Sequence, residues 1–74
     1  MRKWMEFVAK HFEIEVLEDN KIKIECIGHL QERIPLDHVI TLQDGKYTIE
    51  EYIHGTDELL ATWTETSIKE YLGY

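Results

Sequence analysis

The chain has 74 residues, of which 43% are hydrophobic and 11% are aromatic, and its formal net charge is −7. This length leaves room for a single domain, residues 1–74, and the aromatic content is too high for a disordered segment. The acidic charge argues against direct binding to nucleic acid, because phosphate groups repel it.

No signal peptide or membrane span is expected from this sequence. Glu6 and Lys10 interrupt the first apolar stretch, and nowhere do about 18 apolar residues follow one another. The single Cys26 excludes an internal disulfide and fits a reducing compartment. We therefore expect a cytoplasmic protein with no membrane partner. Because the core of so small a domain is thin, support from a partner or a second copy is also expected.

Residues 2–12 are predicted to form an amphipathic helix. Trp4, Met5, Val8 and Phe12 recur at the helical period, while the charged residues of this segment fall on the opposite arc. Such an apolar stripe is what a helix needs to cover one face of a sheet.

Two strands are predicted next, at residues 13–16 and 21–26, where apolar and polar residues alternate. Asp19-Asn20 supplies the turn between them. A two-residue loop would pair Val16 with Lys23 and mix the two faces. We predict a three-residue loop instead, in which Val16 faces Ile24 and the apolar residues share one face. In that register Ile14 faces Cys26.

Residues 28–37 are predicted to form a connecting loop. Gly28 ends the preceding strand, and Pro35 moves Ile34 away from helical geometry. The loop is expected to be anchored by three apolar side chains, namely Leu30, Ile34 and Leu36.

A hairpin is predicted around Asp44-Gly45, which separates strands at residues 38–43 and 46–53. Pairing Gln43 with Lys46 puts Ile40 opposite Ile49 on one face. The same register pairs the following residues: Leu42 with Tyr47, and Thr41 with Thr48.

The chain is predicted to end with a third strand of this meander, residues 58–64, and a short helix. The strand register that pairs Ile49 with Trp63 also pairs Tyr52 with Leu60. Ser67 and Glu70 match a capping box at the start of the helix, and Gly73 suits its end. The same strand register pairs Glu51 with Ala61 and Ile53 with Leu59.

These elements predict an α+β fold. An N-terminal amphipathic helix would pack on an antiparallel sheet of about five strands, made of a hairpin and a three-stranded meander, with a short C-terminal helix.

No metal, cofactor or catalytic site is predicted. Cys26 and His29 form a Cys-x-x-His pair, but a structural zinc site usually needs a second close pair, which His38 and His54 do not supply. The histidines are expected at the surface and the thiol in the core. Carboxylates are plentiful, but so small a domain leaves little room for a cleft that would tune one as a catalyst. We therefore expect a protein that is not an enzyme.

The surface on the reverse face of the meander is the predicted protein contact. Aromatic and aliphatic side chains stand there among threonines, as they do in interfaces with an aromatic anchor. Two other readings stay open: threonine and tyrosine favour strands anyway, or the C-terminal helix covers this face. The predicted contact residues are Val39, Thr48, Glu50, Tyr52, Leu60 and Thr62.

The leading hypothesis for function is a small acidic interaction or regulatory module that binds a larger protein through a basic site on that protein. In composition it is comparable to small acidic proteins of mobile elements that inhibit host machinery. A protein that competes for a nucleic-acid site by mimicry needs dense carboxylates on one face, and the acidic clusters at 13–19 and 50–58 would supply these only if they lay side by side. The alternative is a structural subunit that closes a homodimer through the same surface, and a less favoured one is a metal-binding or catalytic domain at Cys26 and His29.

Overall fold

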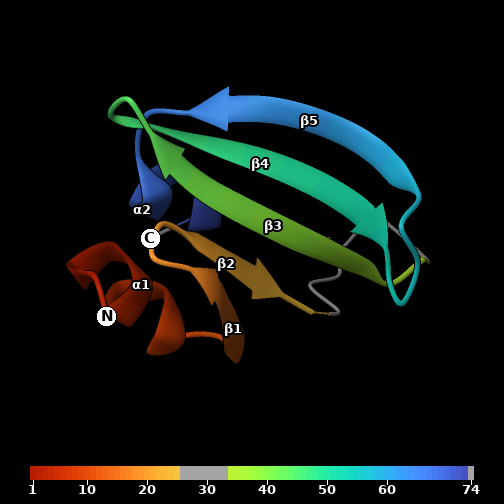
Figure 1. Ribbon diagram of the computed structural model, residues 1–74, viewed down its shortest axis with the longest axis horizontal. Coiled ribbons are helices and arrows are strands. Elements are labelled where there is room, and N and C mark those ends of the chain that lie inside the picture. The colour runs from red at the N-terminus through yellow and green to blue at the C-terminus, as the bar shows by residue number, and fades with distance from the viewer. Residues whose placement is uncertain (26–33, 74) are drawn as a thin grey trace.

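A computed structural model describes residues 1–25 and 34–73 (Figure 1). It contains one antiparallel sheet of five strands and two short helices, which confirms the predicted mixture of helix and antiparallel sheet. The strands lie in chain order, so each pairs with its neighbours in sequence. The elements are α1 (Lys3–Ala9), β1 (Ile14–Glu18), β2 (Lys21–Ile24), β3 (Leu36–Gln43), β4 (Lys46–Ile53), β5 (Leu59–Glu65) and α2 (Ile68–Leu72).

The predicted hairpin and meander form one continuous sheet because β2 pairs with β3. Ile22 lies opposite Ile40, and Lys23 lies opposite Val39. The prediction that the connecting loop reaches residue 37 is wrong at its end, since β3 begins at Leu36. Leu36 is fully buried within the strand, whereas Ile34 is 51% exposed and anchors nothing. The third predicted anchor, Leu30, lies outside the described residues.

The hairpin of β3 and β4 has the predicted register along its whole length. Gln43 pairs with Lys46, and Ile40 pairs with Ile49. The two turn residues, Asp44 and Gly45, have φ angles of 53° and 75°. Both values lie in the left-handed region that a two-residue hairpin turn requires, and glycine and aspartate enter this region more readily than most residues.

The predicted register of β1 and β2 is wrong by two residues. Val16 pairs with Ile22, and Ile14 pairs with Ile24. The cause is an irregularity between Val16 and Glu18, where Leu17 is an extra residue in β1. The bulge takes up the odd residue that the prediction had assigned to the turn, so the apolar residues still face the same side.

A second bulge changes the predicted register at one end of the pair β4 and β5. Ile49 faces Trp63 and Glu51 faces Ala61, as predicted, but Tyr52 faces Leu59. The predicted pairs of Tyr52 with Leu60 and of Ile53 with Leu59 are therefore wrong, since Leu60 is the extra residue of β5. Both outer strands of the sheet thus carry a bulge.

One face of the sheet, here called the core face, carries the hydrophobic core. The fully buried strand residues Ile22, Ile24, Ile40 and Ile49 belong to one cluster. The same cluster includes buried side chains from both helices, and the Trp4 ring meets the Tyr47 ring edge-on at 5.3 Å. The helical members of the cluster are Trp4, Met5 and Val8 of α1 and Ile68 of α2.

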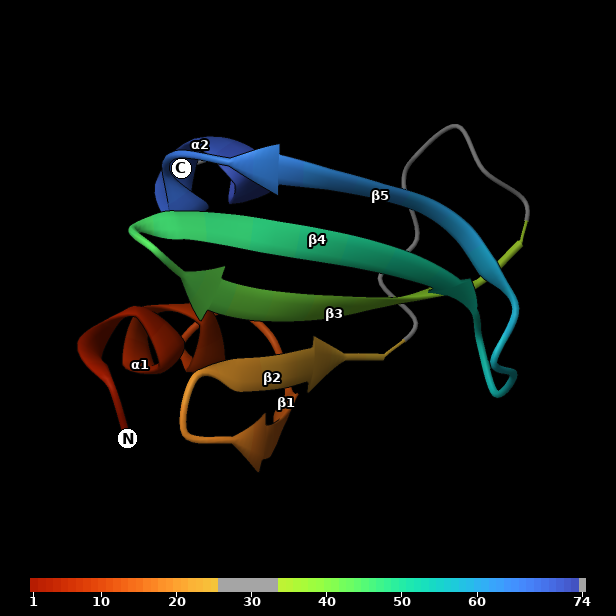
Figure 2. The ribbon, with the colours of Figure 1, turned by 45° about the horizontal axis from the view of Figure 1, so that its top comes forward.

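Because the buried side of α2 belongs to this cluster, α2 does not cover the reverse face of the meander (Figure 2). That reverse face is called the open face below. Along β3 and β4 most of its side chains are half-buried, whereas Asp37 is buried and Gln43 and Lys46, next to the hairpin turn, are exposed. The residues of β3 and β4 on the open face are Asp37, Val39, Thr41, Gln43, Lys46, Thr48, Glu50 and Tyr52, which face one another in the pairing of β3 with β4. Within the described chain, neither helix has the length and apolar character needed to cross a membrane.

Both ends of α2 are capped by the residues that the sequence indicates. The Ser67 hydroxyl accepts a hydrogen bond from the Glu70 backbone N–H at 3.3 Å. Gly73 ends the helix at a φ of 83°, a left-handed conformation that glycine adopts without strain.

A buried polar network ties α2 to the middle of the sheet. His38, which was expected at the surface, is fully buried on the core face, and its Nε2 lies 3.1 Å from the Glu51 carboxylate. Because a carboxylate accepts only, Nε2 donates to Glu51, and Nδ1 on the other side of the ring forms a hydrogen bond with the Tyr71 hydroxyl. Burial, together with the charges of Glu51 and Glu65, raises the pKa of Tyr71 well above its ordinary value of 10.0.

Tyr71→Phe tests this network. Removing the hydroxyl leaves the buried Nδ1 of His38 without this hydrogen-bond partner, so we expect a loss of about 1–3 kcal/mol in the free energy of unfolding at neutral pH. Because the folded pKa of Tyr71 is raised, its contribution is complete below pH 10 and falls above it, where the unfolded chain ionises first. Urea unfolding should therefore show the gap between the two proteins narrowing above pH 10. A gap that stays constant up to the alkaline limit would contradict the network.

Candidate functional site

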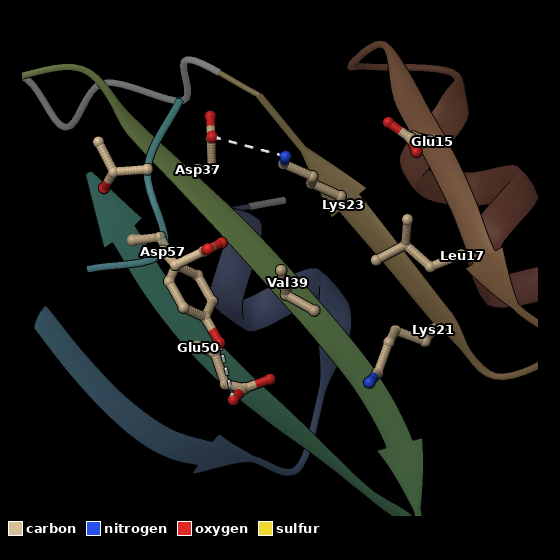
Figure 3. Close-up of a pocket in the computed structure, with 10 residues that line it drawn as sticks. Glu15, Leu17, Lys21, Lys23, Asp37, Val39, Glu50 and Asp57 are labelled. Atoms are coloured by element: carbon tan, nitrogen blue, oxygen red, sulfur yellow. Dashed lines mark hydrogen bonds and ion pairs between the residues drawn. The ribbon is translucent and has the colours of Figure 1, made fainter. Parts of the chain in front are cut away.

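A groove of about 490 Å³ crosses the open face (Figure 3). It is called the acidic groove below. Its lining comes from four strands, β1 to β4, and from the loop that follows β4, so it extends over most of the width of the sheet. The lining residues are Glu15, Leu17, Lys21, Lys23, Asp37, Val39, Glu50, Tyr52, Thr56 and Asp57.

Apolar surface lies between charged groups in this groove. Val39 projects from β3 near the middle, with Leu17 of β1 on one side (Figure 3). Tyr52 also lines the groove and belongs to β4, the strand on the other side of β3. Leu17 is 41% exposed because it occupies the bulge of an outer strand. A ligand with an apolar portion would find three separate contacts across the groove.

Asp37 holds one wall of the groove in place. Its buried carboxylate lies 2.8 Å from His54 Nδ1 and accepts a hydrogen bond from the Gly55 N–H at 3.2 Å. Lys23 Nζ lies 3.8 Å from the same group. Buried carboxylates need such partners to offset the loss of water. Asp37 thereby fixes the loop after β4, which carries Asp57 into the groove.

The loop after β4 is also closed by its own hydrogen bonds. Thr56 donates from both its N–H and its hydroxyl to the Ile53 carbonyl, at 3.0 and 2.9 Å. The Thr56 hydroxyl in turn accepts from the Glu58 N–H at 3.1 Å. These bonds leave Asp57 at the tip, exposed and directed towards the groove (Figure 3).

The two lysines of the groove are already paired with carboxylates. Lys21 lies 3.3 Å from Glu18, and Lys23 lies within 4 Å of Glu25 and Asp37. By contrast, three lining carboxylates have no ion-pair partner among the described residues: Glu15, Glu50 and Asp57. The groove therefore offers negative charge that the described chain does not neutralise.

Tyr52 is a hydrogen-bond donor beside these carboxylates. Its hydroxyl donates to Glu50 at 3.2 Å. Partial desolvation, this bond and the charges of Glu50 and Asp57 raise the pKa of Tyr52 above its ordinary value. The hydroxyl therefore stays protonated at neutral pH and holds the Glu50 carboxylate over the apolar surface.

The two acidic segments of the sequence meet at this groove. Glu15 comes from the first segment, and Glu50 and Asp57 come from the second. A smaller hollow of about 210 Å³ shares part of this lining and adds two further acidic residues of the first hairpin, Glu13 and Glu25. Glu15 and Lys23 belong to both hollows, and the other lining residues of the smaller one are Glu13, Ile14 and Glu25.

The structure brings together three of the six predicted contact residues, since Val39, Glu50 and Tyr52 line the acidic groove. Thr48 lies on the open face outside the groove. Thr62 belongs to the outer strand β5, where it is exposed and pairs with Glu50 of β4. Leu60 is 48% exposed at the bulge of β5.

Seven lining residues were missed by the sequence analysis. Four belong to the first hairpin, and they reach the groove because β2 pairs with β3, across a connection that the sequence pattern does not define. A signal did exist in the alternation of Lys21 and Lys23 with isoleucines, which assigns both lysines to one face. The residues missed are Glu15, Leu17, Lys21, Lys23, Asp37, Thr56 and Asp57.

The histidines and the cysteine offer no metal site in the described part of the chain. His38 is committed to Glu51 and Tyr71, and His54 to Asp37. Cys26 and His29 lie outside the described residues. Among those described, no group of three or more histidine, cysteine, aspartate or glutamate side chains is placed to hold a metal ion.

Comparison with known proteins identifies no relative: no family model matches the chain, and no curated protein or solved structure is similar to it.

Asp37→Asn tests whether this carboxylate holds the groove wall. The amide keeps the shape but loses the charge that faces His54 and Lys23, so we expect a loss of about 2 kcal/mol in the free energy of unfolding. Asp57→Asn is the matched control, because it removes an exposed charge nearby and should change stability by less than about 0.5 kcal/mol. Urea denaturation measures both. Equal effects of the two substitutions would show that Asp37 has no special role.

Proposed function

We propose that the protein is an interaction module whose acidic groove binds a basic segment of a larger protein. One observation carries this proposal: Glu15, Glu50 and Asp57 surround an apolar surface and have no ion-pair partner among the described residues. A lysine or arginine side chain combines a cationic head with an apolar stem, so it complements both properties of the groove.

The width of the groove favours a protein segment over a small cation. Its lining extends from β1 to the loop after β4, and carboxylates stand at both sides of the apolar centre. A segment with basic side chains on either side of an apolar residue would reach Glu15 at one end and Asp57 at the other. The proposal places the apolar residue over Val39 and the Tyr52 ring.

The overall charge supports the choice of a basic partner. At a net charge of −7, the protein attracts basic surfaces at a distance and repels phosphate backbones. Binding of this kind regulates a larger protein when the occupied segment has another ligand, because the two compete.

The proposal gives the two faces of the sheet separate roles. The N-terminal helix α1 packs over the core face and, with α2, closes the hydrophobic core. The open face is left for the partner. Support comes from the membership of Trp4, Met5 and Val8 in the core cluster, while Val39, Glu50 and Tyr52 on the open face stay half-buried.

Binding of a fluorescent probe peptide, in which lysine and arginine alternate with leucine, tests this function. Fluorescence anisotropy should show saturable binding that weakens as salt is raised, because exposed ion pairs are screened. The double variant Glu50→Gln with Asp57→Asn should raise the dissociation constant by about ten-fold, which corresponds to roughly 1.4 kcal/mol.

Two controls separate the groove from net charge. Glu6→Gln removes a carboxylate from the exposed side of α1 and should leave the dissociation constant within about two-fold of the wild-type value. A peptide with glutamate in place of its basic residues should not bind. The single variants Glu50→Gln and Asp57→Asn are measured beside Glu6→Gln. The proposal fails if Glu6→Gln raises the dissociation constant as much as either of these two does.

A further inference from the structure

The two outer strands of the sheet differ in the number of charged side chains that stand beside their unpaired backbone groups. An outer strand exposes N–H and C=O groups that can pair with another chain, and charged side chains are a common protection. β1 has five residues, of which Glu15 and Glu18 are charged. β5 is longer, and from Leu59 to Thr64 it has no charged residue and no proline. The β5 edge therefore lacks the protection that the β1 edge has.

The side chains of β5 are suited to strand pairing. Among the described residues, its exposed positions include Leu59 and Leu60, which are 47% and 48% exposed. Threonines at 62 and 64 alternate with Ala61 and Trp63, which face the core side. Beta-branched and aromatic residues are those that strands favour. Apart from β4, no strand of the described chain pairs with β5.

We propose that β5 pairs with β5 of a second copy of this chain, so that two sheets join into one. A two-fold axis perpendicular to the sheet lies midway between the two Thr62 residues. It keeps the core faces of both copies on the same side. In this register Thr62 faces Thr62 of the second copy, and Ala61 faces Trp63. The small side chain of Ala61 thus lies opposite the large side chain of Trp63. The two Trp63 rings of the dimer do not lie opposite each other.

The paired segment is compatible with a second copy although the net charge of −7 on each chain opposes association. The paired segment, residues 60–64, is neutral, so no like charges lie directly opposite one another. Glu65, the first carboxylate beyond it, accepts a hydrogen bond from Trp63 Nε1 of its own chain at 2.7 Å and is turned back towards that ring. The bulge at Leu60 ends the regular part of the strand at the other side. A second copy brings a strand of the same short neutral length.

Sedimentation of the wild-type protein over about 10 µM to 1 mM tests the pairing. We expect the mass to rise from one chain to two with concentration, and the dimer to become tighter as salt is raised, because salt screens the repulsion between two acidic copies. This salt dependence is opposite to that expected for peptide binding in the acidic groove. A mass that stays at one chain throughout overturns the proposal.

Substitution at the axis tests the register. Thr62→Lys places two lysines directly opposite each other, so we expect the dimer dissociation constant to rise by about five-fold or more, and the same for Thr62→Glu with two carboxylates. An equal mixture of these two variants should restore a dimer, since lysine then faces glutamate. Val16→Lys, an exposed position on the opposite outer strand, is the matched control and should leave the dimer unchanged.

A dimer dissociation constant that is unchanged by Thr62→Lys would overturn the register and with it the pairing through β5. The same holds if the mixture of the two variants forms no more dimer than either variant alone. Circular dichroism of each variant checks that the sheet is intact, and thermal unfolding confirms that a loss of dimer is not a loss of fold.

Discussion

Two neighbouring residues at the start of β3 hold both sides of the molecule together. Because side chains alternate along a strand, Asp37 and His38 point to opposite faces of the sheet, and both are buried. His38 binds Glu51 and Tyr71, which fixes α2 on the core face. Asp37 binds His54 and the Gly55 N–H, which fixes the loop that carries Asp57. A buried polar group without partners is costly, so this pair specifies one arrangement of the elements around it.

The acidic groove is a consequence of that arrangement. The loop after β4 brings Asp57 towards Glu50 and Tyr52, while the pairing of β2 with β3 brings Glu15 and Leu17 to the other side. The lysines at this face are neutralised by carboxylates of their own neighbourhood. What remains is negative charge without an ion-pair partner in residues 1–25 and 34–73, placed around apolar surface, and this combination is the physical basis of the proposed partner. The proposed pairing through the outer strand β5 uses a surface of different character, in which residues 59–64 carry no charged side chain.

The fold was predictable wherever local chemistry decides it. Asp44-Gly45 determines the turn and therefore the whole register of β3 and β4, and Ser67 and Gly73 determine the ends of α2. The two register errors have one cause: each outer strand contains an extra residue, Leu17 or Leu60, and an alternating pattern does not reveal a bulge. β3 was predicted from residue 38, two residues after its observed start at Leu36, because Pro35 suggested that the irregular segment continued. Only the part of the candidate site that lies within one hairpin was predictable from the sequence. Val39, Glu50 and Tyr52 share a face within one hairpin, whereas Glu15, Lys23 and Asp57 reach that face only through pairings and a loop that depend on the tertiary structure.

Nuclear magnetic resonance of the labelled protein, titrated with the basic probe peptide, tests the assignment of function to the open face most directly. The account predicts that saturating shifts concentrate on Glu15, Val39, Glu50, Tyr52 and the loop at Asp57, while the indole N–H of Trp63 and the core-face residues stay unchanged. Shifts that spread over α1 and the β5 edge without saturation would contradict it, because they would show that the peptide recognises net charge and not the acidic groove.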